Sequence, residues 1–293
     1  MSLSVHLRDL SLRYGETTAL DGLSLELAGG KVYGLLGRNG SGKTSLLSVL
    51  AARRRASAGT VLVDGEDPFE NTRIMRRTCF IRDEVDAYEQ TSVRQALRFA
   101  ARLRPHWDED YAHHLVDTFK LPVKKKVSAL SRGMKSALGI TLGLACRAPL
   151  TIFDESYLGM DAPSRYAFYD ELLSDYAENP RTIILSTHLI EEVNSLFEEI
   201  VILDNGRLVL HEEVDTLRAR GVSVTGPAEV VDRFTAGLTV LGEQRLGNTK
   251  AVTVYERFDD ARRRAARAAG LELGAVPVQD LFVHLTRQPE AQR

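Results

Sequence analysis

Residues 37 to 44 read Gly37-Arg38-Asn39-Gly40-Ser41-Gly42-Lys43-Thr44 and decide the fold class of the chain. They fill the pattern GxxxxGK[ST], which is typical of a phosphate-binding loop. An apolar run, Val32 to Leu36, comes directly before the loop, and a helical pattern, Ser45 to Ala52, follows it. Because this order of strand, loop and helix is the setting that such a loop needs, we expect an α/β nucleotide-binding protein.

Each position of the loop has a physical reason. The glycines lack the Cβ atoms that would keep backbone N–H groups from curling around a polyphosphate, and the helix that follows offers its positive N-terminus. Lys43 is expected to neutralise the β- and γ-phosphate oxygens, and Thr44 to offer a hydroxyl to Mg²⁺. The residues expected to bind the nucleotide in this segment are Gly37, Arg38, Asn39, Gly40, Ser41, Gly42, Lys43, Thr44 and Ser45.

Composition excludes several classes of function. The 293 residues are 44% apolar, which is enough for a hydrophobic core, and 38 basic against 40 acidic residues give a net charge of -2. This balance gives no support to nucleic acid as a partner. Cys79 and Cys146 lie far apart without CxxC spacing, so neither a disulfide framework nor a zinc site is indicated. No window has the length of uninterrupted apolar sequence that a membrane span needs, and no signal peptide is indicated at the start.

Short β-branched runs alternate with helical periods, as in an α/β domain with a mainly parallel sheet. The clearest strands after the loop are Leu150 to Asp154 and Thr182 to Ser186. A helical subdomain is expected at about residues 90–147, with helices at Val93 to Leu103 and Asp108 to Phe119, while Leu3 to Leu27 favours antiparallel strands. The texture changes near residue 220, so we expect domains at 1–220 and 221–293, the second a small α+β extension.

A second acidic site follows the strand that begins at Leu150. Asp154 and Glu155 end this apolar run, and neighbouring side chains of a strand point to opposite faces. We therefore expect Asp154 to hold Mg²⁺ through water and Glu155 to act as the general base toward the attacking water. Acidic pairs after strands also occur for purely structural reasons, and the phosphate loop is what favours the catalytic interpretation.

With these motifs and a third, Leu130-Ser131-Arg132-Gly133-Met134, residues 3 to 215 resemble the ATP-binding subunit of an ABC transporter. The third motif resembles the family signature LSGGQ. The resemblance implies that Ser131, Gly133 and Met134 close over ATP held by the phosphate loop of another subunit, so that hydrolysis needs a head-to-tail dimer. Taken alone, Ser131 is better explained as a helix N-cap, and its place 23 residues before Asp154 is what favours the signature.

Three further positions match the family by order and context. Tyr14 matches the aromatic residue that stacks on adenine, although a core or turn tyrosine is the alternative. His188, after the strand Thr182 to Ser186, resembles the histidine that contacts the γ-phosphate. Asp161 matches the loop that communicates across the dimer, and it could instead cap a helix that starts at Ala162.

The chain departs from the family at several positions. Where the family has a glutamine that binds Mg²⁺, alignment places Asp83, whose carboxylate can serve the metal but lacks an amide donor. Arg132 and Met134 replace glycine and glutamine in the signature, and Ser156 replaces a proline. We expect these changes to tune the ATPase without abolishing it.

The resemblance extends to partners and location. It implies ATP and Mg²⁺ as cofactors, a homodimer or heterodimer of ATP-binding subunits, and a separate integral membrane permease bound near Asp83. The cellular location implied is the cytoplasm, peripheral on the inner face of the membrane. The degenerate signature and the short tail ending Val278 to Leu285 resemble export-type subunits, including the bacitracin-exporter-like group. The alternative is a soluble regulatory ABC ATPase that is not coupled to transport.

Overall fold

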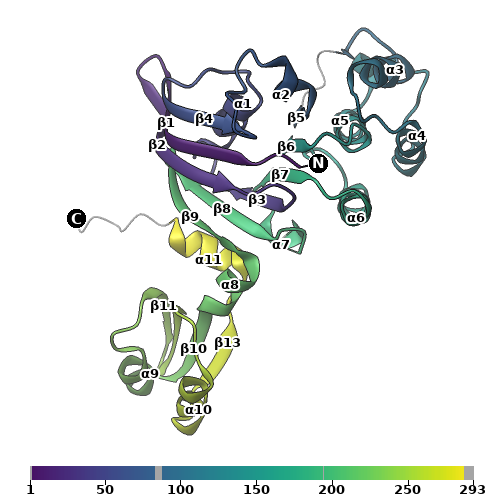
Figure 1. Cartoon of the computed structure of the whole chain (residues 1–293). Coiled ribbons are helices and arrows are strands. Elements are labelled where there is room, and N and C mark those ends of the chain that lie inside the picture. Colours follow the sequence, from purple (N-terminus) through teal and green to yellow (C-terminus); the bar gives the residue numbers. More distant parts are fainter. Residues whose placement is uncertain (1, 83–87, 194, 287–293) are drawn as a thin grey trace. The chain divides into compact units, whose positions relative to one another are not determined.

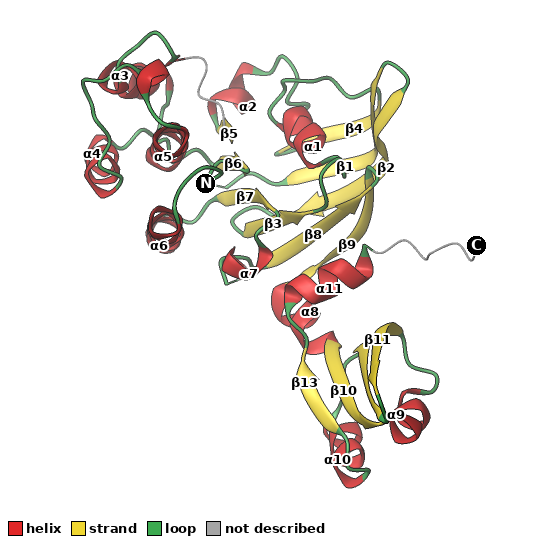
Figure 2. Cartoon of the chain, turned by 180° about the vertical axis from the view of Figure 1, so that it is seen from behind, coloured by secondary structure: helices red, strands yellow, loops and turns green. Residues whose placement is uncertain are grey.

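The computed structural model describes residues 2–82, 88–193 and 195–286. The chain divides into two compact units. Unit 1 comprises Met1–His188 and Leu203–Leu208, and unit 2 comprises Leu189–Ile202 and Val209–Arg293. The division passes through strands β8 (Glu199–Asp204) and β9 (Arg207–Glu213). Most elements of both units are labelled in Figure 1 and Figure 2.

The centre of unit 1 is a parallel sheet. Its strands pair in the order β5 (Thr78–Arg82), β6 (Leu150–Asp154), β7 (Thr182–Thr187) and β3 (Val32–Leu36). Every residue of β3, β6 and β7 is buried, as expected for parallel strands that are covered on both faces. The register aligns the carboxyl ends, so the segments that follow β3, β6 and β7 leave the sheet at the same edge.

An antiparallel sheet precedes and flanks this core, as the alternation in Leu3 to Leu27 predicts. Its order is β2 (Thr17–Leu27), β1 (Val5–Tyr14) and β4 (Ala58–Val63). Buried leucines alternate with exposed polar residues along β2, which is the pattern of a sheet with one solvated face. The antiparallel subdomain expected for the fold class is therefore present.

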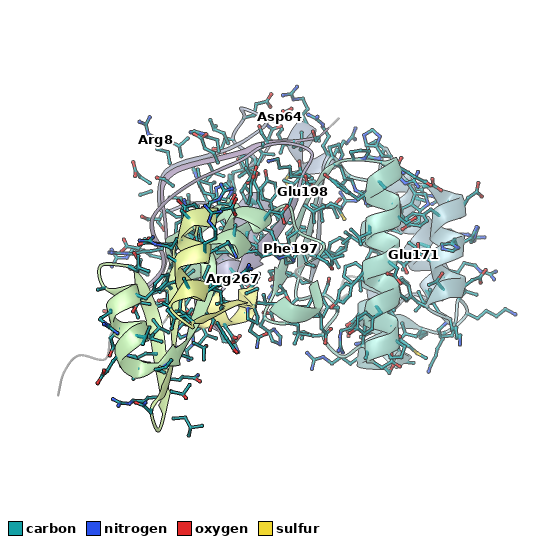
Figure 3. The ribbon with its side chains drawn as sticks, turned by 90° about the horizontal axis from the view of Figure 1, so that it is seen from below. Arg8, Asp64, Glu171, Phe197, Glu198 and Arg267 are labelled. Atoms are coloured by element: carbon teal, nitrogen blue, oxygen red, sulfur yellow. The ribbon has the colours of Figure 1, made fainter. Side chains whose placement is uncertain are left out.

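Four helices form the helical part of unit 1. They are α3 (Val93–Leu103), α4 (Glu109–Thr118), α5 (Arg132–Ala145) and α6 (Ala162–Glu178), with a 3-10 turn at Val127–Ala129. Glu171 on α6, which Figure 3 labels, meets the imidazole of His114 on α4 at 2.6 Å. Helix α5 lies close to the parallel sheet because Gly143 faces the side chains of Phe153 and Ile81.

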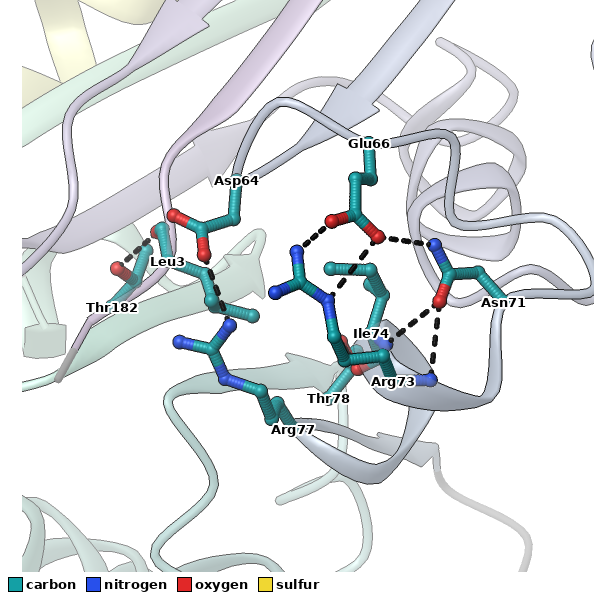
Figure 4. Close-up of polar contacts among 9 residues, drawn as sticks. All are labelled: Leu3, Asp64, Glu66, Asn71, Arg73, Ile74, Arg77, Thr78 and Thr182. Carbon is teal, nitrogen blue, oxygen red and sulfur yellow. Dashed lines mark hydrogen bonds and ion pairs between the residues drawn. The ribbon is translucent and has the colours of Figure 1, made fainter.

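A polar network fixes the short helix α2 (Thr72–Arg76) ahead of β5 (Figure 4). Asn71 is its N-cap, because the Asn71 side chain accepts hydrogen bonds from the backbone N–H groups of Arg73 and Ile74. Glu66 forms an ion pair with Arg73 and accepts a hydrogen bond from Asn71 at 2.8 Å. Asp64 pairs with the Arg77 guanidinium at 2.9 Å, which anchors the chain just before β5.

Unit 2 has an α+β composition and begins before residue 221, since it also contains Leu189–Ile202 and Val209 to Arg220. After α7 (Ile190–Val193) and α8 (Val214–Arg220) come six elements in the order βαββαβ, then α11 (Val278–Leu285). The six are β10 (Gly221–Pro227), α9 (Ala228–Thr235), β11 (Val240–Leu246), β12 (Thr249–Tyr255), α10 (Asp260–Ala268) and β13 (Glu272–Ala275). The antiparallel strand order β11-β12-β10-β13 is that of a ferredoxin-like unit.

Among the helices of the described residues, none combines the length and apolar character that crossing a membrane requires.

Candidate functional site

The segment after β3 forms a tight loop that requires glycine at positions 37 and 42. A Cβ on Gly37 would lie 2.2 Å from the Ser41 Oγ and 2.7 Å from the Leu203 carbonyl oxygen. Gly42 has a φ of 103°, and a Cβ on it would lie 2.7 Å from the Ala19 carbonyl oxygen, so both its conformation and its surroundings exclude a side chain. The loop therefore has the close backbone approach that a polyphosphate cradle needs.

The start of helix α1 (Lys43–Leu50) is open to an anion. Its N-cap is Gly42, and no side-chain cap hydrogen bond is formed at this end by the described residues. The amides of the first turn and the helix dipole together favour negative charge at this end. The Ser41 hydroxyl is 3% exposed and forms no hydrogen bond with the residues that the structure describes. Oxygen acceptors of a bound phosphate would satisfy both sets of donors, so the residues present fit ATP.

Lys43 lies inside the loop and is 6% exposed. Its Nζ donates to the carbonyl oxygens of Gly37 at 2.6 Å and Arg38 at 3.3 Å. The Glu155 Oε1 lies 3.8 Å from the same ammonium group. Burial lowers the pKa of Lys43 from its usual value, while the carboxylates of Glu155 and Asp154 act in the opposite direction.

A buried serine forms hydrogen bonds with both acidic residues at the end of β6. Ser186 Oγ donates to Asp154 Oδ1 at 2.7 Å and accepts from the backbone N–H of Glu155 at 3.1 Å. Asp154 is 5% exposed, and Arg82 Nε lies 3.6 Å from its Oδ2. Glu155 has a φ of 49°, an uncommon conformation for a residue other than glycine, which turns the chain at the end of the strand. Such strain is typical of functional sites.

His188 completes the cluster from the end of β7. Its Nδ1 lies 3.5 Å from the Glu155 Oε1, and its side chain is 44% exposed. The Glu155 carboxylate is therefore close to both Lys43, in the first turn of α1, and His188, just after β7. Thr44, one residue after the lysine, is exposed and free of the core.

The signature segment forms the start of α5. Ser131 is the N-cap, accepting from the backbone N–H of Met134 at 3.3 Å, so the capping interpretation holds for its geometry. A Cβ on Gly133 would lie 2.7 Å from the Gly159 carbonyl oxygen, and Ser136 Oγ donates to the Leu158 carbonyl at 2.6 Å. The signature segment is therefore packed directly against the loop between β6 and α6.

The other predicted site residues lie apart from the cluster around Lys43 or outside the described residues. Asp161 caps α6, with its carboxylate accepting from the backbone N–H of Ser164 at 3.0 Å. Tyr14 ends β1, is 40% exposed and lies under the Arg54 guanidinium at 5.4 Å. Asp83 falls between the described ranges 2–82 and 88–193. In the described ranges, no three His, Cys, Asp or Glu side chains form a cluster able to hold a metal.

Two contributors escaped the sequence analysis. Ser186 bridges Asp154 and Glu155, and Arg82 faces Asp154 from the neighbouring strand. In the sequence, Ser186 is marked only by being a hydroxyl residue near the end of a buried strand, next to a strand that ends in an acidic residue. Pairing of Asp154 with Ser186 and with Arg82 follows from the strand register, which a single sequence does not provide.

A phosphate loop after β3, with carboxylates and a histidine after β6 and β7, defines a P-loop ATPase. Residues 20–157 match the family model described as ABC transporter. The chain is 30% identical to the daunorubicin resistance ATP-binding protein DrrA3 of Streptomyces coeruleorubidus, over 94% of this chain and 93% of that protein. It therefore belongs to the ABC transporter ATP-binding proteins, a family of ATPases.

Two further similarities agree with this assignment. The bacitracin transport ATP-binding protein BcrA of Bacillus licheniformis is 30% identical over 224 residues, covering 75% of this chain and 73% of that protein. A solved structure described as the ATP-binding subunit of an ABC transporter has the same fold, with a TM-score of 0.66 and 24% identity, over 73% of this chain and 91% of that one. The chain is an ATP-binding subunit of an ABC transporter and fits the bacitracin-exporter-like group.

Proposed function

We propose that this chain is the Mg²⁺-dependent ATPase subunit of an exporter and works on the inner face of the cell membrane. The observation that carries the proposal is the meeting of Lys43, Glu155 and His188 at one edge of the sheet. Residues 1–220 form the ATP-binding domain in this proposal, and residues 221–293 form the extension. The names of DrrA3 and BcrA, which refer to drug resistance and bacitracin transport, support export.

In the proposed mechanism, the buried Lys43 ammonium binds the β- and γ-phosphate oxygens beside the amides of α1. Glu155 accepts the proton of the attacking water, and His188, close to that carboxylate, contacts the γ-phosphate. Bound Mg²⁺ would neutralise phosphate charge, held by Thr44 and by Asp154 through water, with Asp83 as a third oxygen donor. The phosphate oxygens would complete its coordination, which is why protein carboxylates need not cluster.

The signature residues serve a second subunit in this proposal. Ser131, Gly133 and Met134 lie at the N-terminus of a 14-residue helix, where backbone amides favour a phosphate. The loop that includes Asp161 is packed against this segment through Gly159, so the two would move together at a dimer interface. Tyr14 supplies the stacking surface for adenine. Either two copies of this chain or a heterodimer would complete the sites.

A groove in unit 1 is the proposed docking site of the permease. It has a volume of about 380 Å³ and is lined from α2, α3 and the segment before α3. Tyr88 and Leu103 line it, and Phe99 stacks edge-on against Tyr88 with ring centroids 6.0 Å apart. Phe99 and Leu103 are 54% and 56% exposed, one helical turn apart. An exposed apolar patch beside a groove is typical of a surface that binds a helix of a partner protein, because binding removes the apolar side chains from water.

The test is ATP hydrolysis by the purified chain over a range of protein concentrations, with and without Mg²⁺. We expect the rate per molecule to rise with concentration, because each site needs residues of two subunits, and to vanish without Mg²⁺. Glu155→Gln should lower turnover by about 10²- to 10⁴-fold while ATP binding persists, because only the proton acceptor is lost. Unchanged turnover in Glu155→Gln would contradict the proposed base. ATP binding without turnover in the unmodified chain, with or without its permease, would favour a regulatory clamp.

A further inference from the structure

The sheet of unit 2 has two faces of opposite character. One face carries Val222, Val224, Val252 and Val254, which form the core of the unit together with Val231, Phe258, Ala266 and Leu271. Because side chains alternate along a strand, Ser223 and Thr253 point to the other face. That second face carries a pocket of about 570 Å³, walled on one side by helix α11. The fold of the unit does not need this pocket, because its core lies on the valine side.

Small side chains keep the floor of the pocket open. The strand register places Gly242, Thr253, Ser223 and Gly274 in one row across all four strands. Ala251 and Gln244 form the neighbouring pair and also line the pocket. A layer between a helix and a sheet is normally filled with interlocking apolar side chains. Here the floor offers hydroxyl and amide groups instead, which is the lining of a site for a polar ligand.

His284 of α11 packs closely against Gly242 on the floor of the pocket, and one of its ring nitrogens forms no hydrogen bond with the described residues. A Cβ on Gly242 would lie 2.2 Å from the His284 Cε1 and 2.7 Å from its Nδ1, so glycine is needed for this approach. The Nδ1 atom is buried and has no hydrogen-bond partner among the described residues. Buried polar atoms are nearly always partnered in folded proteins. A bound ligand that lines up with His284 would supply the missing partner.

The charge at the pocket favours a cation. Glu243 lies 2.7 Å from the Lys250 ammonium, and Asp232 shares the same ammonium at 2.7 Å. Asp280, in the first turn of α11, lines the pocket and forms no ion pair with the part of the chain that the structure describes. Asp232 and Lys250 lie outside the lining, so among the described residues that line the pocket Asp280 and Glu243 are acidic and none is a lysine or arginine, with His284 as the other titratable group. The excess negative charge selects against anions.

We propose that this pocket is a binding site for a small polar molecule that carries an ammonium group. Asp280 pairs with the ammonium, and Ser223, Thr253, Gln244 and His284 form hydrogen bonds with the polar remainder. The volume lies within the range of pockets that hold small organic ligands. The site lies wholly in unit 2 and is made of residues that the ATPase mechanism does not use. Ligand binding at this site can therefore be tested independently of ATP hydrolysis.

Isothermal titration calorimetry of the full chain, in physiological salt and without nucleotide, tests the proposal. The probes are spermidine and glucosamine as amines, with glucose and succinate as neutral and anionic comparisons. We expect saturable binding of at least one amine and none of succinate. Asp280→Asn should weaken that binding by about 10-fold or more, because the ammonium group would then pair with a neutral amide oxygen in place of a carboxylate. Ser223→Leu, which places a bulky side chain on the floor, should abolish it.

Asp260→Asn is the matched control. Asp260 is also an aspartate in the first turn of a unit 2 helix, α10, and it does not line the pocket. Its loss should leave amine binding unchanged while removing a comparable helix-end charge. The proposal is overturned if neither amine binds in the millimolar range, or if Asp280→Asn and Asp260→Asn bind alike. Should Ser223→Leu fail to fold, the comparison of the two aspartate variants still decides.

Discussion

Removal of the Ser186 hydroxyl should lower both the stability of the chain and its ATP turnover. Its hydroxyl donates to the buried Asp154 carboxylate at 2.7 Å and accepts from the Glu155 N–H at 3.1 Å. A hydrogen bond to a charged group contributes about 1.5–3 kcal/mol and a neutral one about 0.5–1.5 kcal/mol. Ser186→Ala should therefore lower the free energy of unfolding by about 2–4 kcal/mol. ATP turnover should fall as well, because the positive φ of Glu155 loses its support.

Ser156 provides the comparison. Like Ser186 it is fully buried, but its hydroxyl forms no hydrogen bond with any described residue. Ser156→Ala removes the same atom and leaves no partner unsatisfied. Its free energy of unfolding should stay within about 1 kcal/mol of the unmodified chain, on the stabilising side. The two variants differ only in whether the lost oxygen had partners.

The assay is urea unfolding at pH 7.5 without nucleotide, followed by tryptophan fluorescence. Trp107 is the only tryptophan of the chain and belongs to unit 1, so the signal reports the unit that contains both serines. ATP turnover is measured on the same preparations. If Ser186→Ala and Ser156→Ala unfold within about 0.5 kcal/mol of each other, the bridging role assigned to Ser186 is wrong.

Two other predictions concern packing and pH. Gly143→Ala should lower the free energy of unfolding by about 1–3 kcal/mol, because its Cβ would lie 2.6 Å from the Phe153 ring. Gly139→Ala, whose Cβ would come no closer than 3.1 Å to a neighbour, should lower it less in the same urea assay. Burial and the hydrogen bond to Glu212 raise the pKa of Tyr255 to about 12 from about 10. Its stabilising contribution is thus complete below pH 10 and lost as the pH rises through 12, so the stability difference between the unmodified chain and Tyr255→Phe should shrink over that range in thermal unfolding scans.

Much of unit 1 could be predicted from the sequence because its signals are local. The apolar runs Val32 to Leu36 and Leu150 to Asp154 form strands with those same bounds, and Val93 to Leu103 forms a helix with the predicted bounds. The helix after the phosphate loop begins at Lys43, two residues earlier than predicted. The reason is that the left-handed Gly42 is the N-cap, which leaves Lys43 and Thr44 in the first turn.

What could not be predicted depends on contacts between distant segments. Nothing in one sequence shows that Ser186 stands opposite Asp154, since that pairing comes from the register of β6 and β7. The pocket of unit 2 is similar, because its floor is a row of residues from four strands. The helix α11, from Val278 to Leu285, was recognised only as a tail, and its role as the wall of a pocket needs the packing of His284 on Gly242.

The altered signature shows how a departure from the family pattern is accommodated within the chain. Arg132 stands where the family has a glycine, and a Cβ on Gly159 would lie 2.8 Å from the Arg132 Cγ. Gly159, with a φ of 89°, thus makes room for the stem of the arginine on the loop that leads to Asp161. The arginine is therefore a packed component of the contact between signature and loop. Any effect of Arg132 on turnover should act through the position of that loop as well as through its charge, so Arg132→Met, which keeps the stem, should separate the two contributions.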